Sequence, residues 1–194
     1  MNKYLKVMFG QKSGADNSFE YKIDEVNIAN IWNPNASDPK EMGGFNFSVE
    51  DKILRWLVRG DTLYDVEIPK GAEVIDCESA SAPHGVFRTN KIIITNPRKV
   101  TDELAMELYL KSNLPEKSYY KAMAGCAVRG YINTAVKILE DKVNVDNVDL
   151  ALEEFKDFCS HNDTGIFNEN DLGNDTRRIY DMLLNIKNES GEVK

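Results

Sequence analysis

The chain has 194 residues, of which 42% are hydrophobic and 29% charged, a composition typical of a globular protein. This length allows one well-buried core, or a domain with a small appended subdomain. No apolar run approaches the roughly 20 residues that cross a bilayer, and the first residues lack the apolar core of a secretory leader. We therefore expect no membrane span and no leader. Three cysteines without Cys-x-x-Cys spacing and only two histidines suit a reducing cytoplasm and give no metal-site pattern.

The negative charge is concentrated near the C-terminus. The formal net charge is −8, and residues 140–194 hold 6 Lys+Arg against 14 Asp+Glu, so the remainder of the chain is neutral. One interpretation is an acidic helical face that aids solubility, and another is a surface that docks on a basic protein. No basic stripe is visible, so we do not expect direct binding of nucleic acid.

The first hundred residues have the alternating pattern of strands. Residues 4–9 and 19–26 are expected to pair as a hairpin, and the turn-forming stretch 27–39 with its two prolines predicts a loop. Further strands are expected at residues 45–47, 63–68, 74–77 and 91–95.

A helix is expected directly after the strand at residues 45–47. Ser48 is followed by an acid at Asp51, the spacing of a serine N-cap. Ile53 and Leu57 then belong to a broad apolar face, and Gly60 predicts the end of the helix.

From Thr101, which predicts a helix cap, the pattern becomes helical. A long helix over residues 116–141 contains Gly125, Gly130 and several alanines, small residues that allow another element or a second copy of the chain to approach closely. The other helices are expected at residues 101–110, 145–160 and 176–186.

These elements predict an α+β protein. The expected domains are a mixed β-sheet domain over residues 1–100, a helical subdomain with an acidic surface over 101–188, and a flexible tail over 189–194.

The segment GGFNFS at 43–48 and the helix after it, followed by LYDVEIP and GVFRTNKIIITNP, resembles small ADP-ribosyltransferase-like domains. It is also similar to uncharacterised phage and bacterial domains of the same layout, over about residues 4–100. In the transferase family a strand that ends in serine lies beside the nicotinamide pocket, which implies a role for Ser48 and NAD as the cofactor. The family's Arg or His on the first strand is missing here, as is a glutamate on the late strand. An enzyme of this kind would therefore use Ser48, Arg88 and the displaced Glu78.

The same resemblance places a ligand cleft at the mouth of these strands. His84 lies in a Pro/Gly turn between two expected strands. The plainer interpretation is a turn histidine without a role, and the other is a ligand contact. The candidate ligand-binding residues are Phe45, Phe47, His84, Thr89 and Asn90.

Three functions from different classes follow. The preferred hypothesis is a small acidic cytoplasmic accessory protein, phage-borne by its resemblance, that binds and inhibits a basic nucleic-acid-handling host or defence protein. The alternatives are an NAD-dependent ADP-ribosyltransferase or nucleotide-processing enzyme, and a structural homo-oligomer built through the Gly/Ala helix face. The candidate partner-binding residues are Glu153, Glu154, Asp157, Asp163 and Asp171.

Overall fold

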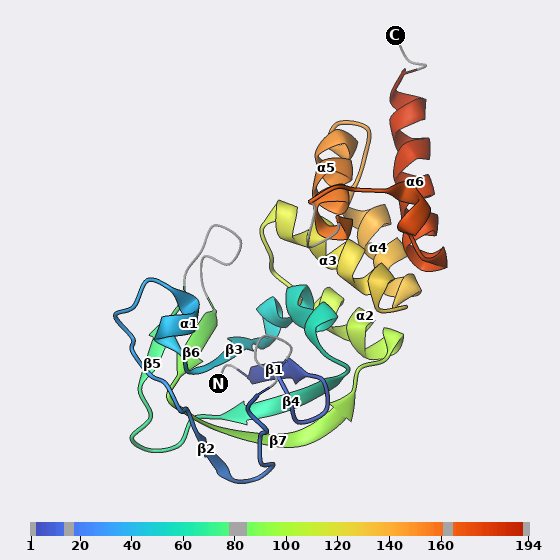
Figure 1. Cartoon of the computed structure of the whole chain (residues 1–194). Helices are drawn as coiled ribbons and strands as arrows, with labels where there is room; N and C mark the ends of the chain where they lie inside the picture. The colour runs from blue at the N-terminus through green and yellow to red at the C-terminus, as the bar shows by residue number, and fades with distance from the viewer. Residues whose placement is uncertain (1–2, 14–17, 78–84, 161–164, 192–194) are drawn as a thin grey trace. The chain divides into compact units, whose positions relative to one another are not determined.

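The computed structural model describes residues 3–13, 18–77, 85–160 and 165–191 (Figure 1). The chain divides into two compact units, each of which has its own core. Unit 1 is Met1–Val100 with Lys111–Asn113, and unit 2 is Thr101–Leu110 with Leu114–Lys194. Strands belong to the first unit and most helices to the second, so the predicted α+β class is confirmed.

Unit 1 is built on a seven-stranded sheet with the order β2-β7-β4-β1-β3-β6-β5. All pairs of named strands are antiparallel, and in the described part of the chain parallel bridging is limited to one bridge between Ile23 and Ile94. The strands are β1 (Tyr4–Met8), β2 (Val26–Ile28), β3 (Phe45–Val49), β4 (Thr62–Glu67), β5 (Val74–Asp76), β6 (Val86–Thr89) and β7 (Lys91–Lys99).

The expected hairpin between residues 4–9 and 19–26 is wrong. The strand β1 pairs instead with β3 and β4, and only Val26–Ile28 forms a strand, which pairs with β7. Residues 19–23 alternate because one side of the segment lies on the sheet: Tyr21 is 3% exposed and belongs to the core. Alternation reports burial on one side, and it does not by itself identify the partner strand.

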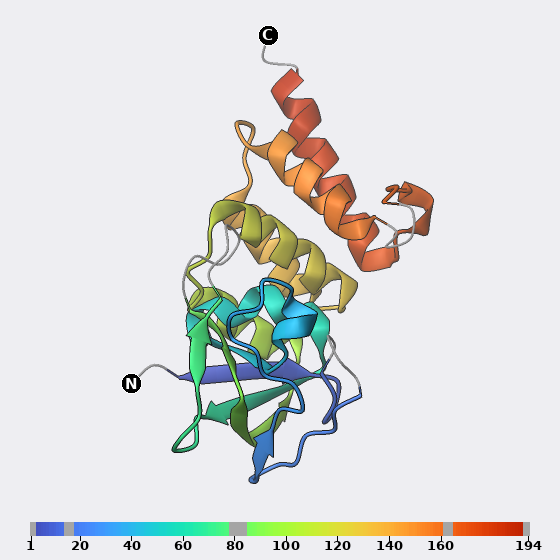
Figure 2. The ribbon, with the colours of Figure 1, turned by 60° about the vertical axis from the view of Figure 1, so that its left-hand side comes forward.

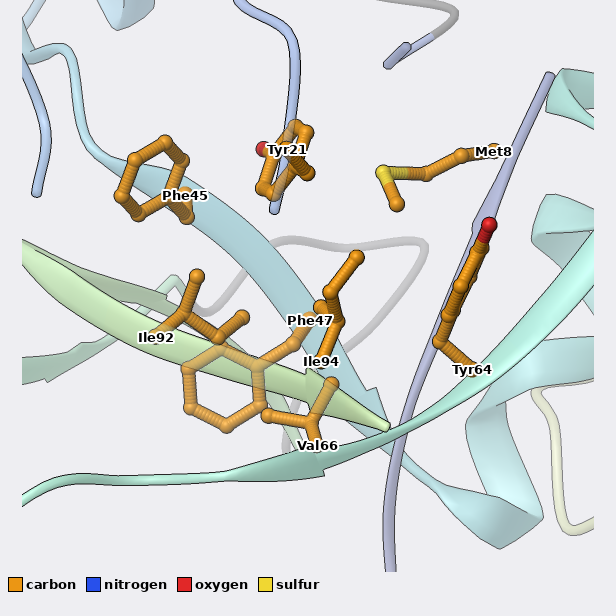
Figure 3. Packing of buried hydrophobic residues seen from close by; sticks show 8 residues of the cluster. All are labelled: Met8, Tyr21, Phe45, Phe47, Tyr64, Val66, Ile92 and Ile94. Carbon is orange, nitrogen blue, oxygen red and sulfur yellow. The ribbon is translucent and has the colours of Figure 1, made fainter. Parts of the chain in front are cut away.

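One apolar cluster fills the face of the sheet that the segment around Tyr21 covers (Figure 3). Its aromatic rings meet mainly edge to face, with 5.0 Å between the ring centres of Phe19 and Phe45 and 5.2 Å between those of Tyr4 and Phe47. The buried members are Met8, Tyr21, Phe45, Phe47, Tyr64, Val66, Ile92 and Ile94.

Ser48 is not the helix cap that the sequence predicts. The cap position of the 3-10 helix η1 (Glu50–Arg59) is Val49, and no side chain of the described residues caps that end. Strand pairing with Leu5 and Val86 keeps Ser48 inside β3, where alternation directs its side chain away from Phe47.

Gly60 ends η1 as predicted, although its backbone is extended there. A Cβ at Gly60 would lie 2.3 Å from the carbonyl oxygen of Met8, so this glycine also allows η1 to end close against β1. The described part of unit 1 also contains the short helix α1 (Pro39–Met42).

Unit 2 is helical, and the expected single helix over residues 116–141 is wrong. The chain turns at Gly130, whose φ is +77°, and this glycine separates α3 from α4. The N–H of Gly130 donates to the carbonyl of Ala127, and that of Tyr131 donates to the carbonyl of Cys126. The helices are α2 (Asp102–Leu110), α3 (Glu116–Val128), α4 (Ile132–Lys142), α5 (Val148–Cys159), η2 (Glu169–Asp171) and α6 (Asn174–Gly191).

Helices α5 and α6 lie side by side in unit 2 (Figures 1 and 2). The ring of Phe155, which is fully buried, stacks on that of Tyr180 at 6.0 Å. Helix α6 continues to Gly191, so residues 189–191 of the expected flexible tail are its last turn. The Oγ1 of Thr101 accepts from the N–H of Leu104, and the predicted cap of α2 is therefore confirmed. Among the helices that the structure describes, none is long and apolar enough to cross a membrane.

Candidate functional site

A cavity of about 200 Å³ lies in unit 1 beside β1 and β3. Its described lining includes two lysines and no aspartate or glutamate, which gives the cavity a positive character. Aromatic rings and uncharged polar side chains complete the wall. The lining residues are Lys6, Ser13, Ser18, Phe19, Tyr21, Ala29, Asn30, Ile31, Lys40, Gly43, Gly44, Phe45 and Asn46.

Lys6 is the buried charge of this cavity, with 5% of its surface exposed. Its Nζ donates to the backbone carbonyl of Asn46 at 2.6 Å and lies 5.2 Å from the ring centre of Tyr21. Desolvation by burial, followed by repulsion from Arg88, lowers the pKa of Lys6 to about 7. An amine with this pKa gains or loses its proton at neutral pH.

Two glycines form a tight part of the cavity wall. Gly43 and Gly44 both have positive φ, and a Cβ at Gly43 would lie 2.2 Å from the carbonyl oxygen of Ile31. A Cβ at Gly44 would lie 2.6 Å from the ring of Trp32. The guanidinium of Arg88 donates to the carbonyl of Gly43 at 2.9 Å, so this residue supports the wall from behind.

The structure describes two of the three proposed catalytic residues, Ser48 and Arg88. Ser48 is 1% exposed, and its Oγ has no hydrogen-bond partner among the described residues. Ser48 pairs in register with Val86 and Arg88 with Asn46, so both side chains belong to the same face of the sheet, opposite the face of Phe45 and Phe47. Glu78 lies outside the described residues.

Of the predicted ligand-binding residues, Phe45 lines the cavity. Phe47 is in the core, where its ring stacks on that of Phe87 at 5.3 Å. Thr89 is fully buried and donates to the carbonyl of Lys91, and the side chain of Asn90 accepts from the backbone N–H of Glu73. The side chains of Phe47, Thr89 and Asn90 therefore have partners within the fold. His84 lies outside the described residues.

The sequence carries a signal for Lys6 in the pattern of its first strand. In the first strand, Lys6 is in phase with Tyr4 and Met8, both of which face the apolar cluster. A lysine at a core-facing position of a central strand is rare, because burial of an ammonium group is costly unless it is compensated. Such a residue identifies a candidate site.

Helix α5 presents the predicted acidic surface. Its exposed positions are Asp149, Glu153 and Asp157, each four residues from the next, and we call this set the acidic stripe. Four-residue spacing places the three carboxylates on one face of the helix. Asp149 is 2.7 Å from the Nζ of Lys187, and Asp157 is 3.0 Å from that of Lys121.

Two other predicted acids do not belong to the stripe. Glu154 is buried on the inner side of α5, where its carboxylate forms ion pairs with Lys117 at 3.1 Å and with Lys121 at 3.2 Å. Asp171 is exposed at the end of η2, and Asp163 lies outside the described residues.

The cysteines offer no activated thiol in the described residues. Burial raises the pKa of Cys126 to about 12 and that of Cys159 to about 11, and desolvation also raises the pKa of Cys77. A thiol with such a pKa stays protonated at neutral pH and is a poor nucleophile.

Comparison of the sequence with protein-family models, curated proteins and solved structures gave no match.

Proposed function

We propose that the protein acts by binding a protein partner with a basic surface, through the acidic stripe of α5. The observation that carries this proposal is that every exposed position of α5 is an acid: Asp149, Glu153 and Asp157. The wider charge distribution supports it, because residues 140–194 hold the whole net charge of the chain.

Helix stability does not explain the stripe. Like charges four residues apart destabilise a helix by about 0.2–0.5 kcal/mol per pair. The two lysines that contact the stripe, Lys121 and Lys187, are themselves 40% and 51% exposed. Exposed ion pairs of this kind contribute about 0–1 kcal/mol, so a partner's Lys or Arg side chains can replace them at little cost. Glu153 has no ion pair among the described residues.

The partner class follows from this chemistry. Three aligned carboxylates complement a row of Lys or Arg side chains, the surface with which many proteins hold nucleic acid. We therefore place the partner among nucleic-acid-handling proteins of the cytoplasm, and we expect nucleic acid to compete with this protein for it. Inhibition of a host or defence protein by a phage-borne accessory protein is the biological setting that the sequence resemblance favours.

The test is a pull-down from a bacterial lysate with the wild type and with a variant that carries Asp149→Asn, Glu153→Gln and Asp157→Asn. The variant should lose at least tenfold in affinity for the basic protein that the wild type recovers, and added DNA or RNA should displace that protein from the wild type. Binding should weaken steeply between low and physiological salt.

A matched control removes three exposed acids from unit 1 instead: Glu20→Gln, Glu25→Gln and Glu67→Gln. The control has the same net charge as the stripe variant and should bind like the wild type. Equal loss of affinity in both variants would show that binding depends on net charge and not on the acidic stripe. Recovery of the partner by the stripe variant would refute the proposal.

A further inference from the structure

We propose that the cavity around Lys6 is a binding site for a small molecule that carries an oxyanion, a carboxylate or a phosphate group. This inference is independent of the proposed function, because it concerns unit 1 and the acidic stripe belongs to unit 2.

The first argument is the missing counter-charge. The ammonium group of Lys6 has three N–H donors, and the carbonyl of Asn46 accepts one of them. None of the ion pairs among the described residues includes Lys6, and no acid lines the cavity there. A buried charge is ordinarily paired, and an anionic ligand would supply the pair.

The second argument is the positive charge around the place where the ligand would lie. Lys40 lines the cavity as an exposed side chain, and Arg88 lies close enough to repel the ammonium group of Lys6. Repulsion between cations without an intervening anion disfavours the protonated form of Lys6. A bound oxyanion would reverse this effect, since it favours the ammonium form.

The third argument concerns the remainder of the ligand. Phe19, Tyr21 and Phe45 give the wall apolar and aromatic surface, and Ser13, Ser18 and Asn30 make another part of the wall polar and uncharged. The volume of about 200 Å³ is below the 300–1,000 Å³ of sites for drug-sized ligands. The site therefore suits a small organic acid or a small phosphate ester in preference to a dinucleotide.

The experiment measures binding of four probes to the full chain by calorimetry: acetate, benzoate, inorganic phosphate and phenyl phosphate. Binding of benzoate more tightly than phenyl phosphate identifies a carboxylate site, and the reverse order identifies a phosphate site. Both results support the proposal. Acetate and inorganic phosphate should bind more weakly than their aromatic counterparts, because they leave the aromatic wall uncovered.

The variant Lys6→Met removes the charge and keeps the length of the side chain. It should weaken binding of the best probe at least tenfold, whereas the control Lys70→Met, at an exposed position outside the cavity, should leave it unchanged. Lys40→Met should weaken binding severalfold. Coincident unfolding curves, or a more stable Lys6→Met variant, establish that the loss of binding is not a loss of fold.

The pH dependence gives a second readout with benzoate, which stays ionised throughout. Because binding requires the ammonium form of Lys6, its affinity should fall about 20- to 30-fold from pH 6.5 to pH 8.5. The other titratable groups of the described lining are Tyr21 and Lys40, and Lys6→Met should remove this dependence while both remain. The proposal is overturned if no probe binds the wild type, or if Lys6→Met binds as tightly as the wild type does.

Discussion

The two units each bury a charged side chain, and the contrast between them separates a structural charge from a site. Glu154 in unit 2 is 8% exposed and has two lysines within 3.2 Å. Lys6 in unit 1 is 5% exposed and has one backbone carbonyl. The charge of Glu154 is therefore compensated by two lysines of the chain itself, whereas no acid among the described residues pairs with Lys6.

The largest expected effect concerns Lys6 and pH. The pKa of Lys6 falls from 10.5 in the unfolded chain to about 7 in the folded protein, so between these values the unfolded state binds one proton more. Stability should therefore rise with pH in this window, by up to about 1.4 kcal/mol per unit. Between pH 6.5 and pH 9.5, the stability of the wild type relative to Lys6→Met should therefore rise by about 3 kcal/mol.

Urea unfolding followed by tryptophan fluorescence measures this effect, because both tryptophans, Trp32 and Trp56, belong to unit 1. The buffer must be free of carboxylates and phosphate. A constant difference between the two proteins from pH 6.5 to 9.5 would show that Lys6 is solvated, and the contrast with Glu154 would then disappear.

The next effect tests the cavity wall. Gly43→Ala places a methyl group against the backbone of Ile31 in addition to the cost of a positive φ. Gly71, with a φ of +77° and no atom within 4 Å of a Cβ, is the matched control. Gly43→Ala should destabilise unit 1 by about 2 kcal/mol more than Gly71→Ala in the same fluorescence assay. Equal costs would indicate that the wall yields to the added methyl group.

A smaller effect is expected at Glu154. Glu154→Gln leaves Lys117 and Lys121 without a carboxylate, but both lysines are partly exposed and can be solvated. The loss should therefore be about 1–2 kcal/mol, less than for a pair that is buried on both sides. Glu153→Gln, one residue away and exposed, should be neutral within about 0.5 kcal/mol. Urea unfolding by circular dichroism compares the two, and a neutral Glu154→Gln would contradict a structural role for this charge.

The smallest effect belongs to the acidic stripe. Its triple amide variant loses two exposed ion pairs and also loses repulsion between like charges, so its stability should stay within about 0.5 kcal/mol of the wild type. The same unfolding curve checks this. A larger loss of stability would mean that the acidic stripe stabilises unit 2. The loss of binding by this variant could then be caused by unfolding.

Two local signals in the sequence predicted helix ends correctly. Thr101 and Gly60 mark helix ends as expected, because a cap and a stop depend on a few adjacent residues. The prediction of Gly130 in a helix interior is wrong, since the alanine-rich sequence on its N-terminal side and the apolar residues after it resemble one continuous helix. Its neighbours did not reveal its positive φ.

Non-local structure was harder to predict. Ser48 follows the capping pattern, yet its pairing with Leu5 and Val86, both distant in sequence, decides its position. The cavity around Lys6 likewise combines β1, α1, β3 and the segment around Tyr21, so no contiguous motif encodes it. The acidic stripe was within reach of sequence analysis, since the spacing of Asp149, Glu153 and Asp157 is visible directly, but the burial of Glu154 was not.

The central position of β1 constrains how unit 1 is synthesised and folded. Tyr4 leaves the ribosome before its strand partners Val49 and Val66, and the sheet is extended by β7, which ends at Lys99. A nascent chain must therefore carry β1 unpaired until much of the unit has emerged. The helices of unit 2 form from local contacts and need no such delay, so folding of the sheet is expected to be the slow step in this protein's maturation.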